Sequence, residues 1–320
     1  MRRIQIPGVR KTLTQLGMGT GADMYHPDHM DYVTALSDAY VELGGNVFDT
    51  AHQYVGSEEA LGKWLELRGL RDSVVIMTKG AHPDDGSPGP RVSARHIKED
   101  MMESLERLRV KHVEMYALHR DDESVPVGEI METLHEAVVK GYVEAIGASN
   151  WTQRRVEEAN RYAAEHNLTP FTFTSTNFSL AKPLEPRWPG CVSADESYMG
   201  WHRENRVPLL SWSSLAGGFF SGRFTPDYRE NEEMVRVYYC EDNWKRVDRA
   251  RELARRKGVD TVQIALAYVL NQPIPIVALV APDNIAEMRS NFAAAEIELS
   301  PEELDWLDLK SGALPEGHAS

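Results

Sequence analysis

The sequence predicts a (β/α)8 barrel of the α/β class, on three observations. Eight short apolar runs recur along the 320 residues, each followed by a turn and then an amphipathic segment of helical length. The runs are continuous rather than alternating, which is typical of parallel strands buried on both faces. One unit takes about 40 residues, which favours one closed barrel over two open sheets. We expect strands at 13–17, 47–49, 74–78, 113–119, 145–149, 171–175, 208–212 and 276–280.

Amphipathic segments between these runs predict the helices. In segment 29–43 apolar residues recur every three or four positions, and a glycine pair follows, as at many helix ends. Segment 93–108 begins with Ser93, a favourable N-cap. The same patterns predict helices at 58–67, 126–140, 152–165, 261–270 and 285–294. An extra C-terminal helix is expected at 301–309, with Ser300 as its cap.

The organisation indicates a single domain spanning 1–320, with a barrel core at about 12–295. No linker, charge block or low-complexity tract marks a boundary. A small hairpin around Pro7 and Gly8 precedes the core and is placed to cap the barrel floor. Two connections, 81–91 and 215–260, are long. The second is rich in aromatic residues, so we expect a lid-like loop there.

Composition excludes several classes of protein. An apolar content of 42% allows a large core and excludes wholesale disorder. The net charge of −14 argues against binding to nucleic acid or an anionic membrane. Cys191 and Cys240 are too few for a disulfide scaffold. The first residues lack the apolar core of a signal peptide, and no apolar run is long enough to span a bilayer, so a cytoplasmic protein is expected. No cluster of metal ligands is evident, and we expect no metal.

Polar side chains follow three of the predicted strands where chemistry is usually located. Asp49, Lys79 and His119 stand at strand ends, and Tyr54 follows Asp49 by five residues. In a barrel the carboxyl ends of the strands share one mouth. Each residue alone is compatible with a structural role: a turn cap, rim packing, a solvated lysine or a core histidine. Four titratable groups on one rim together indicate a catalytic site.

These four groups suit proton transfer to an oxygen atom. A free tyrosine has a pKa of about 10 and is a weak acid at neutral pH. A neighbouring cation lowers that pKa, which predicts that Lys79 activates Tyr54 while Asp49 orients Lys79. His119 would donate a hydrogen bond to a substrate carbonyl. None of the four delivers hydride, so this chemistry requires a nicotinamide cofactor.

Motifs along nearly the whole chain resemble the aldo-keto reductase superfamily. They are FDTAHQY at 48–54, TKG at 78–80, YALHRDD at 116–122, GASN at 147–150, FSLAKPLE at 178–185, SWSSLAGGFFSGRF at 211–224 and APDNIAEMRSNFAAAEI at 281–297. The resemblance implies reduction of an aldehyde or ketone with a nicotinamide dinucleotide, or oxidation of an alcohol in reverse. It implies Tyr54 as general acid or base, Lys79 and Asp49 as residues that tune it, and His119 as the residue that orients the carbonyl.

The resemblance also implies a set of cofactor-binding residues. In the barrel, Gly19 and Thr20 would approach the cofactor near Asp49. Ser149 and Asn150 would hold the carboxamide, together with Ser175 in place of the family's usual glutamine. Trp212 would stack on the nicotinamide, where the family more often has tyrosine. Backbone around Ser213, Leu215 and Gly217 would line the pyrophosphate, and Asn291 would lie on the adenine side.

The cofactor type is left open by the residues near the C-terminus. The family normally places lysine or arginine beside the 2′-phosphate of NADP, and these positions correspond to Ala281, Asp283 and Glu287. Two acids disfavour a phosphate but can bond a free ribose hydroxyl. We therefore expect NADP(H) by resemblance, with NAD(H) use possible. Arg289 would compensate for them if the loop shifts. Alternatively, both acids only cap and solubilise the helix at 285–294.

Three other functions are compatible with parts of the sequence. Residues 17–22 match the dinucleotide pattern G-x-G-x-x-A, but a helix does not follow directly as a Rossmann fold requires. A barrel glycoside hydrolase could pair Asp49 with Asp121 or Asp122, but it leaves Lys79 and Tyr54 without a role. A non-catalytic, cofactor-sensing barrel would not need the intact set of four.

The expected partner is a small-molecule carbonyl or alcohol. The residues expected to contact it are Tyr25, Tyr54, His119 and Trp151, with His82 and Trp188 as further candidates for the pocket wall. Aromatic walls suit a sugar or an aromatic aldehyde. The sequence predicts neither the exact substrate, nor the physiological direction, nor the oligomeric state.

Overall fold

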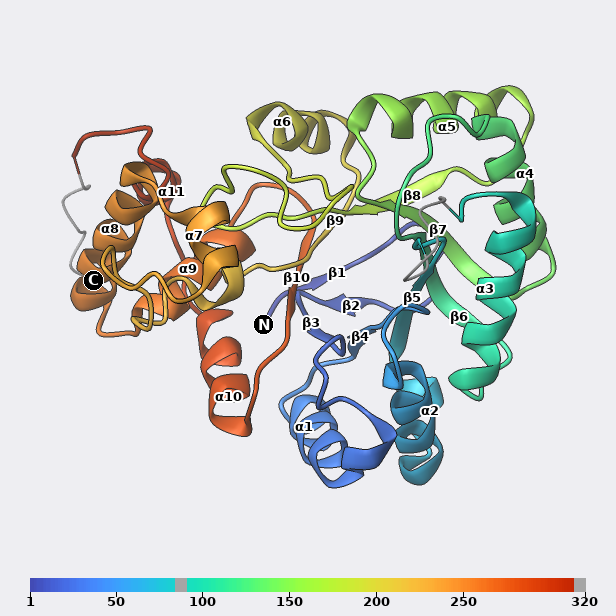
Figure 1. Ribbon diagram of the computed structural model, residues 1–320, viewed down its shortest axis with the longest axis horizontal. Coiled ribbons are helices and arrows are strands. Elements are labelled where there is room, and N and C mark those ends of the chain that lie inside the picture. The colour runs from blue at the N-terminus through green and yellow to red at the C-terminus, as the bar shows by residue number, and fades with distance from the viewer. Residues whose placement is uncertain (84–90, 314–320) are drawn as a thin grey trace.

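The computed structural model describes residues 1–83 and 91–313. Eight parallel strands close into a barrel in the order β10-β3-β4-β5-β6-β7-β8-β9, which confirms the predicted fold (Figure 1). The strands are β3 (Leu16–Gly19), β4 (Val47–Asp49), β5 (Val75–Gly80), β6 (Val113–Leu118), β7 (Val143–Ser149), β8 (Phe171–Ser175), β9 (Leu209–Ser211) and β10 (Ile276–Val280).

Helices surround the strands, with α1 and α2 at the bottom of the view and α3 and α4 on its right (Figure 1). The helices are α1 (Met30–Glu42), α2 (Ser57–Arg68), α3 (Ala94–Arg107), α4 (Val127–Val139), α5 (Gln153–Glu165), α6 (Glu196–Asn205), α7 (Glu232–Tyr238), α8 (Glu241–Lys257), α9 (Thr261–Leu270), α10 (Ile285–Ala294) and α11 (Pro301–Leu307). The predicted C-terminal helix is present as α11, capped by Ser300. Among the described residues, none of the helices has the length and apolarity needed to cross a membrane.

Alternation along each strand divides the core into two clusters. On β5, Val75 and Met77 face the barrel interior, whereas Ile76 packs against the surrounding helices. Successive side chains of a strand point to opposite faces. Both faces are buried, which explains why the apolar runs in the sequence are continuous.

The predicted N-terminal hairpin plugs the barrel floor, the end at which the strands begin. Its strands are β1 (Arg3–Ile4) and β2 (Leu13–Thr14), paired antiparallel. Ile6, Val9 and Leu13 join the interior cluster, and the turn uses Gly8 at a φ of 93°. The expected first barrel strand at 13–17 was therefore misplaced: its first two residues belong to the hairpin, and the barrel strand begins at Leu16.

The predicted loop at 215–260 was wrong, because most of it is helical. It contains α7 and α8, which both lie on the left of Figure 1. Its aromatic residues pack on one another, with the rings of Phe219 and Trp244 4.7 Å apart. Phe219 and Tyr238 are fully buried, so these rings form a core rather than an open lid. The other long connection, 81–91, lies mostly outside the described residues.

Candidate active site

The barrel mouth receives the last inward-facing side chain of each strand. Val47 on β4, Met77 on β5 and Ala117 on β6 point into the barrel. Two residues further along each chain come Asp49, Lys79 and His119, which the pleat turns to the same side. The sequence alternation thus brings an acid, an amine and an imidazole to one mouth.

Asp49 and Lys79 form a buried ion pair there. Lys79 is 2% exposed and Asp49 is 5% exposed, and Nζ of Lys79 donates to Oδ1 of Asp49. Nζ also donates to the carbonyl of Thr50 at 3.1 Å. Burial, the largest single effect, lowers the pKa of Lys79, but the carboxylate of Asp49 and, after it, Tyr54 together outweigh burial and raise that pKa. Lys79 is therefore a fixed positive charge.

Tyr54 reaches the mouth from the connection between β4 and α2. Backbone bonds tie this connection to β5: the amide of Thr50 donates to Met77 at 2.9 Å, and that of His52 donates to Lys79 at 2.8 Å. Lys79 Nζ lies 5.4 Å from the centre of the Tyr54 ring. A Cβ added at Gly21 would lie 3.1 Å from that ring. The glycine therefore lets the chain pass against the tyrosine.

The pKa of Tyr54 is raised, whereas the sequence predicted a lowered one. Burial raises it most; the charge of Lys79 opposes this effect, and that of Asp49 adds to it. Desolvation of the phenolate, which sequence reasoning left out, outweighs the cation. The phenol is thus protonated at neutral pH and is available as a proton donor.

His119 is a neutral imidazole beside Tyr54. Its ring meets the Tyr54 ring edge to face at a centroid distance of 5.7 Å. Burial and the charge of Lys79 hold the pKa of His119 well below its usual range. Its buried Nδ1 has no hydrogen-bond partner among the residues the structure describes. The centroids of the His82 and His119 rings lie 4.8 Å apart. The ring can therefore bond a ligand oxygen.

The next inward positions around the barrel are Ser149, Ser175 and Trp212. Phe173 on β8 and Leu210 on β9 face the interior, so the residues two positions further on face the mouth. Ser149 Oγ donates to the carbonyl of Ser175 at 2.8 Å. Within the described chain, the buried Oγ of Ser175 and Nε1 of Trp212 have no hydrogen-bond partner. Such orphan groups are costly unless a ligand or water satisfies them, and they fit a carboxamide.

Asn150 is already engaged in the protein. Its Nδ2 donates to the carbonyl of His119 at 3.2 Å, and its Oδ1 accepts from the amide of Val192 at 3.2 Å. Asn150 thus braces the segment before α6 against β6. Binding a carboxamide would require it to exchange these bonds.

The turn after β9 has the form of an anion-binding site. Ser213, Ala216 and Gly217 have φ values of 50°, 50° and 63°, a backbone conformation that can turn several N–H groups toward one point. Nη1 of Arg187 donates to Ser213 Oγ at 2.9 Å, and Nη2 of Arg223 donates to the carbonyl of Gly217 at 3.4 Å. Two guanidinium groups beside such a turn suit a pyrophosphate.

Comparisons with known proteins identify the family. A profile of the Aldo/keto reductase family matches residues 15–311. The chain belongs to this family. The norsolorinic acid reductase of Emericella nidulans is 29% identical over 285 residues, covering 84% of this chain and 69% of the relative. The NADP(+) aryl-alcohol dehydrogenase of Phanerodontia chrysosporium is 26% identical over 331 residues, covering 94% and 83%.

Solved structures of aldo-keto reductases share the fold. One from Klebsiella pneumoniae, in complex with NADP and acetate, has a TM-score of 0.73 and 24% identity, covering 96% of this chain and 94% of that one. A thermostable aldo-keto reductase bound to epalrestat has a TM-score of 0.75 and 23% identity, covering 97% and 100%. The protein is thus an aldo-keto reductase by family and fold, and its class is oxidoreductase.

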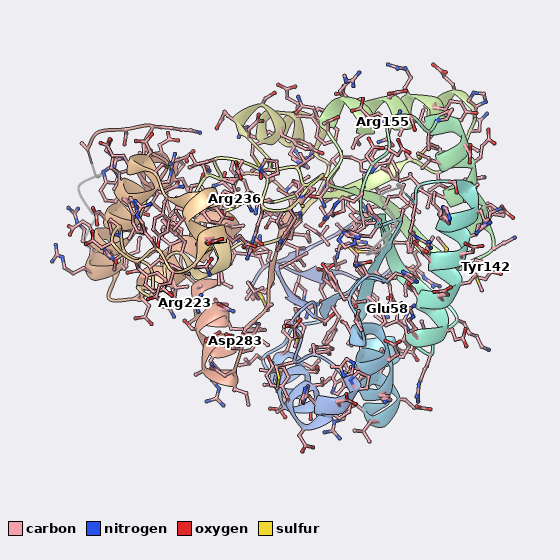
Figure 2. The ribbon with its side chains drawn as sticks, viewed as in Figure 1. Glu58, Tyr142, Arg155, Arg223, Arg236 and Asp283 are labelled. Carbon is pink, nitrogen blue, oxygen red and sulfur yellow. The ribbon has the colours of Figure 1, made fainter. Side chains whose placement is uncertain are left out.

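The acids near the C-terminus play different parts in this aldo-keto reductase. Glu287 accepts from the amide of Asp283 at 3.0 Å and from Nδ2 of Asn284 at 3.1 Å. Glu287 therefore closes the start of α10, as the capping alternative predicted, whereas the cap expected from Asp283 is not formed. The carboxylate of Asp283 is exposed and makes no hydrogen bond or ion pair within the described residues. Figure 2 shows Asp283 and Arg223 both in the left half of the molecule. Asn291 is 6% exposed.

Thr20 does not offer its side chain to the mouth. It is fully buried, and its Oγ1 donates to the carbonyl of Asp49 at 3.0 Å and lies 2.6 Å from Ser57 Oγ. Its backbone is also engaged, because its amide donates to the carbonyl of Asp49 at 2.9 Å and its carbonyl accepts from Ser57 Oγ at 2.9 Å. Of these two residues, the half-buried Gly19 is the one left to approach a cofactor. The dinucleotide-like glycine pattern at 17–22 is accordingly the end of a barrel strand and not a Rossmann turn.

Two predicted substrate contacts were misplaced. Tyr25 is 2% exposed, and its hydroxyl lies 2.8 Å from Ser37 Oγ on α1. Trp151 is fully buried, and its Nε1 donates to the carbonyl of Arg120 at 3.1 Å. Both aromatic side chains belong to the core between barrel and helices. Trp188 lies at the mouth instead, stacked on Trp212 at a centroid distance of 5.7 Å.

Sequence reasoning missed two arginines at this mouth, Arg120 and Arg187. Arg187 bridges Ser213 and the carboxylate of Glu233, which accepts from its Nε at 2.6 Å. Prolines surround Arg187 in the sequence, so this segment shows neither a strand nor a helix pattern that would predict where the side chain lies. Arg120 directly follows His119, so its position at a strand end was a usable signal.

Proposed function

We propose that this aldo-keto reductase reduces an aldehyde or ketone with NADPH or NADH, and that Tyr54 is its general acid. The observation that carries the proposal is the packing at one mouth of a protonated phenol, a neutral imidazole and a buried Asp49–Lys79 ion pair. We also propose the roles given below for Asp49, Lys79, His119 and the cofactor-binding residues. The same proposal treats the chain as a single domain spanning 1–320.

The residues present fit a nicotinamide dinucleotide. Ser175 and Trp212 offer orphan polar atoms at the inner end, and the turn with Ser213 and Gly217 offers left-handed backbone at the outer end. When bound, this cofactor supplies the hydride, or accepts it in the reverse direction. One face of Trp212 already carries Trp188, so a nicotinamide would use the other face or displace Trp188.

The proton follows a defined route in the proposed mechanism. His119 holds the carbonyl oxygen and orients it toward Tyr54. The phenol of Tyr54 donates its proton to that oxygen as the carbon is reduced, which leaves an alcohol and a phenolate. Lys79 stabilises the phenolate, and Asp49 keeps Lys79 in place. A proton from water then restores the phenol, and alcohol oxidation follows the same route backwards.

The charge of Asp283 supports a proposal about the type of cofactor. Its exposed carboxylate, at a position where a 2′-phosphate would lie in the family, repels a phosphate, while Glu287 is occupied by the helix cap. We therefore propose that NAD(H) is used alongside NADP(H). Among substrates, aromatic aldehydes or aryl alcohols suit the site, because their rings can pack on the partly exposed indole rings of Trp188 and Trp212. The names of two relatives, an aryl-alcohol dehydrogenase and a norsolorinic acid reductase, support this class.

The competing functions lack support from the site. A glycoside hydrolase needs two available carboxyl groups. Asp49 is paired with Lys79, Asp121 lies 3.3 Å from Nε of Arg155, and Asp122 accepts from the hydroxyl of Ser124 at 2.7 Å. A cofactor sensor without turnover is separated from a reductase by experiment.

The test is a fluorescence titration with NADPH and NADH, followed by turnover measurements on a panel of aldehydes, ketones and sugars. The proposal expects quenching of tryptophan fluorescence and oxidation of the reduced cofactor by at least one carbonyl. Binding without turnover across the panel would favour the sensor. Absence of cofactor binding would overturn both readings.

A further inference from the structure

Arg120 is a buried cation at the mouth with no acidic partner. It is 8% exposed and directly follows His119. Its Nη1 donates to the carbonyl of His119 at 2.8 Å, and its Nε donates to the carbonyl of Pro189 at 3.3 Å. Over residues 1–83 and 91–313, no carboxylate lies within 4.0 Å of it.

The acids nearest in sequence are committed elsewhere. Asp121 pairs with Arg155, and Asp122 caps the turn at Ser124. Asp49, the carboxylate of the mouth itself, is paired with Lys79. The mouth therefore carries one positive charge more than its carboxylates balance.

Arg120 acts on the reacting groups. Its charge lowers the pKa of the neighbouring His119 imidazole, after burial and Lys79, and it opposes the rise in the pKa of Tyr54. The carbonyl of Pro189 places the guanidinium against the segment that carries Trp188, which stacks on Trp212. The guanidinium thus lies between the end of β6, where His119 follows, and the segment that carries Trp188.

Buried charges in proteins are ordinarily paired, because removal from water is costly. A guanidinium has five N–H donors, and Arg120 uses two of them on carbonyls. The remaining donors match the two oxygens of a carboxylate in a planar fork. The two carbonyls accept hydrogen bonds from Arg120 but carry no negative charge. Its positive charge is therefore left for an anionic ligand to balance.

We propose that Arg120 selects carbonyl substrates that carry a carboxylate group, by pairing with that carboxylate while the carbonyl lies between Tyr54 and His119. This inference rests on the proposed reductase function. It makes Arg120 a specificity-determining residue and not a proton donor.

The alternative is that Arg120 only ties the segment around Pro189 to β6. The two roles predict different effects on KM. Loss of a purely structural contact raises KM for all substrates alike, whereas loss of a partner for the substrate carboxylate raises KM for anionic substrates alone. Arg120→Lys separates the two further, since lysine keeps the charge but cannot make both carbonyl bonds in the same geometry.

The experiment compares 2-, 3- and 4-carboxybenzaldehyde with the corresponding methylbenzaldehydes in the unaltered protein, Arg120→Gln and Arg120→Lys. Arg154→Gln is the matched control, because Arg154 is 74% exposed and pairs with Glu123 on the same side of the barrel. A second readout, independent of turnover, is calorimetric titration of benzoate into the protein in the presence of NADP⁺ and of NAD⁺.

We expect the unaltered protein to prefer at least one carboxybenzaldehyde. In Arg120→Gln, KM for that aldehyde rises roughly tenfold or more, the loss of one charge-assisted bond, while KM for the methylbenzaldehydes stays within about twofold. The loss of charge beside His119 and Tyr54 changes kcat by the same factor for carboxybenzaldehydes and methylbenzaldehydes. Arg120→Lys keeps part of the preference, and Arg154→Gln keeps all of it.

Benzoate affinity falls in parallel in Arg120→Gln, and this result stands even if no aldehyde is turned over. Failure of the proposed function would therefore show as absent turnover with benzoate binding still dependent on Arg120. Equal losses for charged and uncharged aldehydes in both variants, or benzoate affinity unchanged by Arg120→Gln, would overturn the inference. Loss of folding in Arg120→Gln leaves the Arg120→Lys comparison to decide by the same criterion.

Discussion

Replacing Lys79 by methionine removes the cation that contacts Asp49 and lies over the Tyr54 ring. Methionine keeps the length of the side chain and its apolar stem. The proposed mechanism requires Lys79 to stabilise the phenolate form of Tyr54. The substitution should therefore raise the pKa of Tyr54 further above its ordinary value.

The size of the effect follows from the geometry. Lys79 Nζ lies 5.4 Å from the ring centre, and at an effective dielectric constant of about 20 two unit charges at this distance interact by about 3 kcal/mol. That corresponds to about two pKa units. Without its partner Lys79, the buried carboxyl of Asp49, whose pKa burial already raises, takes up a proton. Its negative charge then no longer raises the pKa of Tyr54, and this loss cancels part of the effect. We expect a net rise of roughly one unit.

The assay is the pH dependence of kcat/KM for alcohol oxidation, in which Tyr54 must be ionised to accept the proton. In Lys79→Met the alkaline midpoint moves up by about one unit, and the rate at fixed neutral pH falls about tenfold. Asp49→Asn is the matched control: it removes a negative charge and should move the midpoint downward. An unchanged midpoint in Lys79→Met, in a variant with unaltered circular dichroism, would refute this reasoning.

Two further predictions concern the cofactor and the barrel floor. Asp283→Arg should lower KM for NADPH relative to NADH by roughly tenfold, because it replaces a repelling carboxylate with a phosphate-binding fork; steady-state KM values for both cofactors test it, and an unchanged ratio would show that residue 283 points away from the ribose. Leu13→Ala should lower the free energy of unfolding by about 2–5 kcal/mol, as loss of a fully buried leucine does, without changing KM; urea unfolding measures it, and a loss below about 1 kcal/mol would contradict the hairpin's role as a plug.

The barrel was predictable because each of its strands can be recognised from its own short stretch of sequence. Runs such as 74–78 are buried on both faces and stay apolar throughout, so neither register nor partner is needed to find them. Asp49, Lys79 and His119 were predictable for a related reason. Each follows an apolar run at the position where the pleat continues into the mouth.

The parts that sequence reasoning missed depend on contacts between distant segments. The burial that raises the pKa of Tyr54 comes from several elements at once, and no spacing in the sequence reports it. Tyr25 and Trp151 follow strand ends, as pocket residues do, but Ser37 and the carbonyl of Arg120 hold them in the core. The helix α8 was different, because its buried Val247 and Ala250 recur at helical spacing. That signal was present among the aromatic residues that suggested a lid.

Tyr54→Phe tests the role of Tyr54 as general acid, because it removes one hydroxyl and keeps the ring against Lys79 and His119. Tyr142→Phe makes the same chemical change directly before β7, at the end of the strand opposite to the mouth; Figure 2 shows Tyr142 at the right edge of the molecule. Turnover and cofactor affinity are measured side by side on the same preparations. If Tyr54 is the general acid, Tyr54→Phe binds NADPH and NADH as the unaltered protein does but loses roughly 10²-fold or more in kcat, while Tyr142→Phe keeps both. A near-normal kcat in Tyr54→Phe would show that another group supplies the proton.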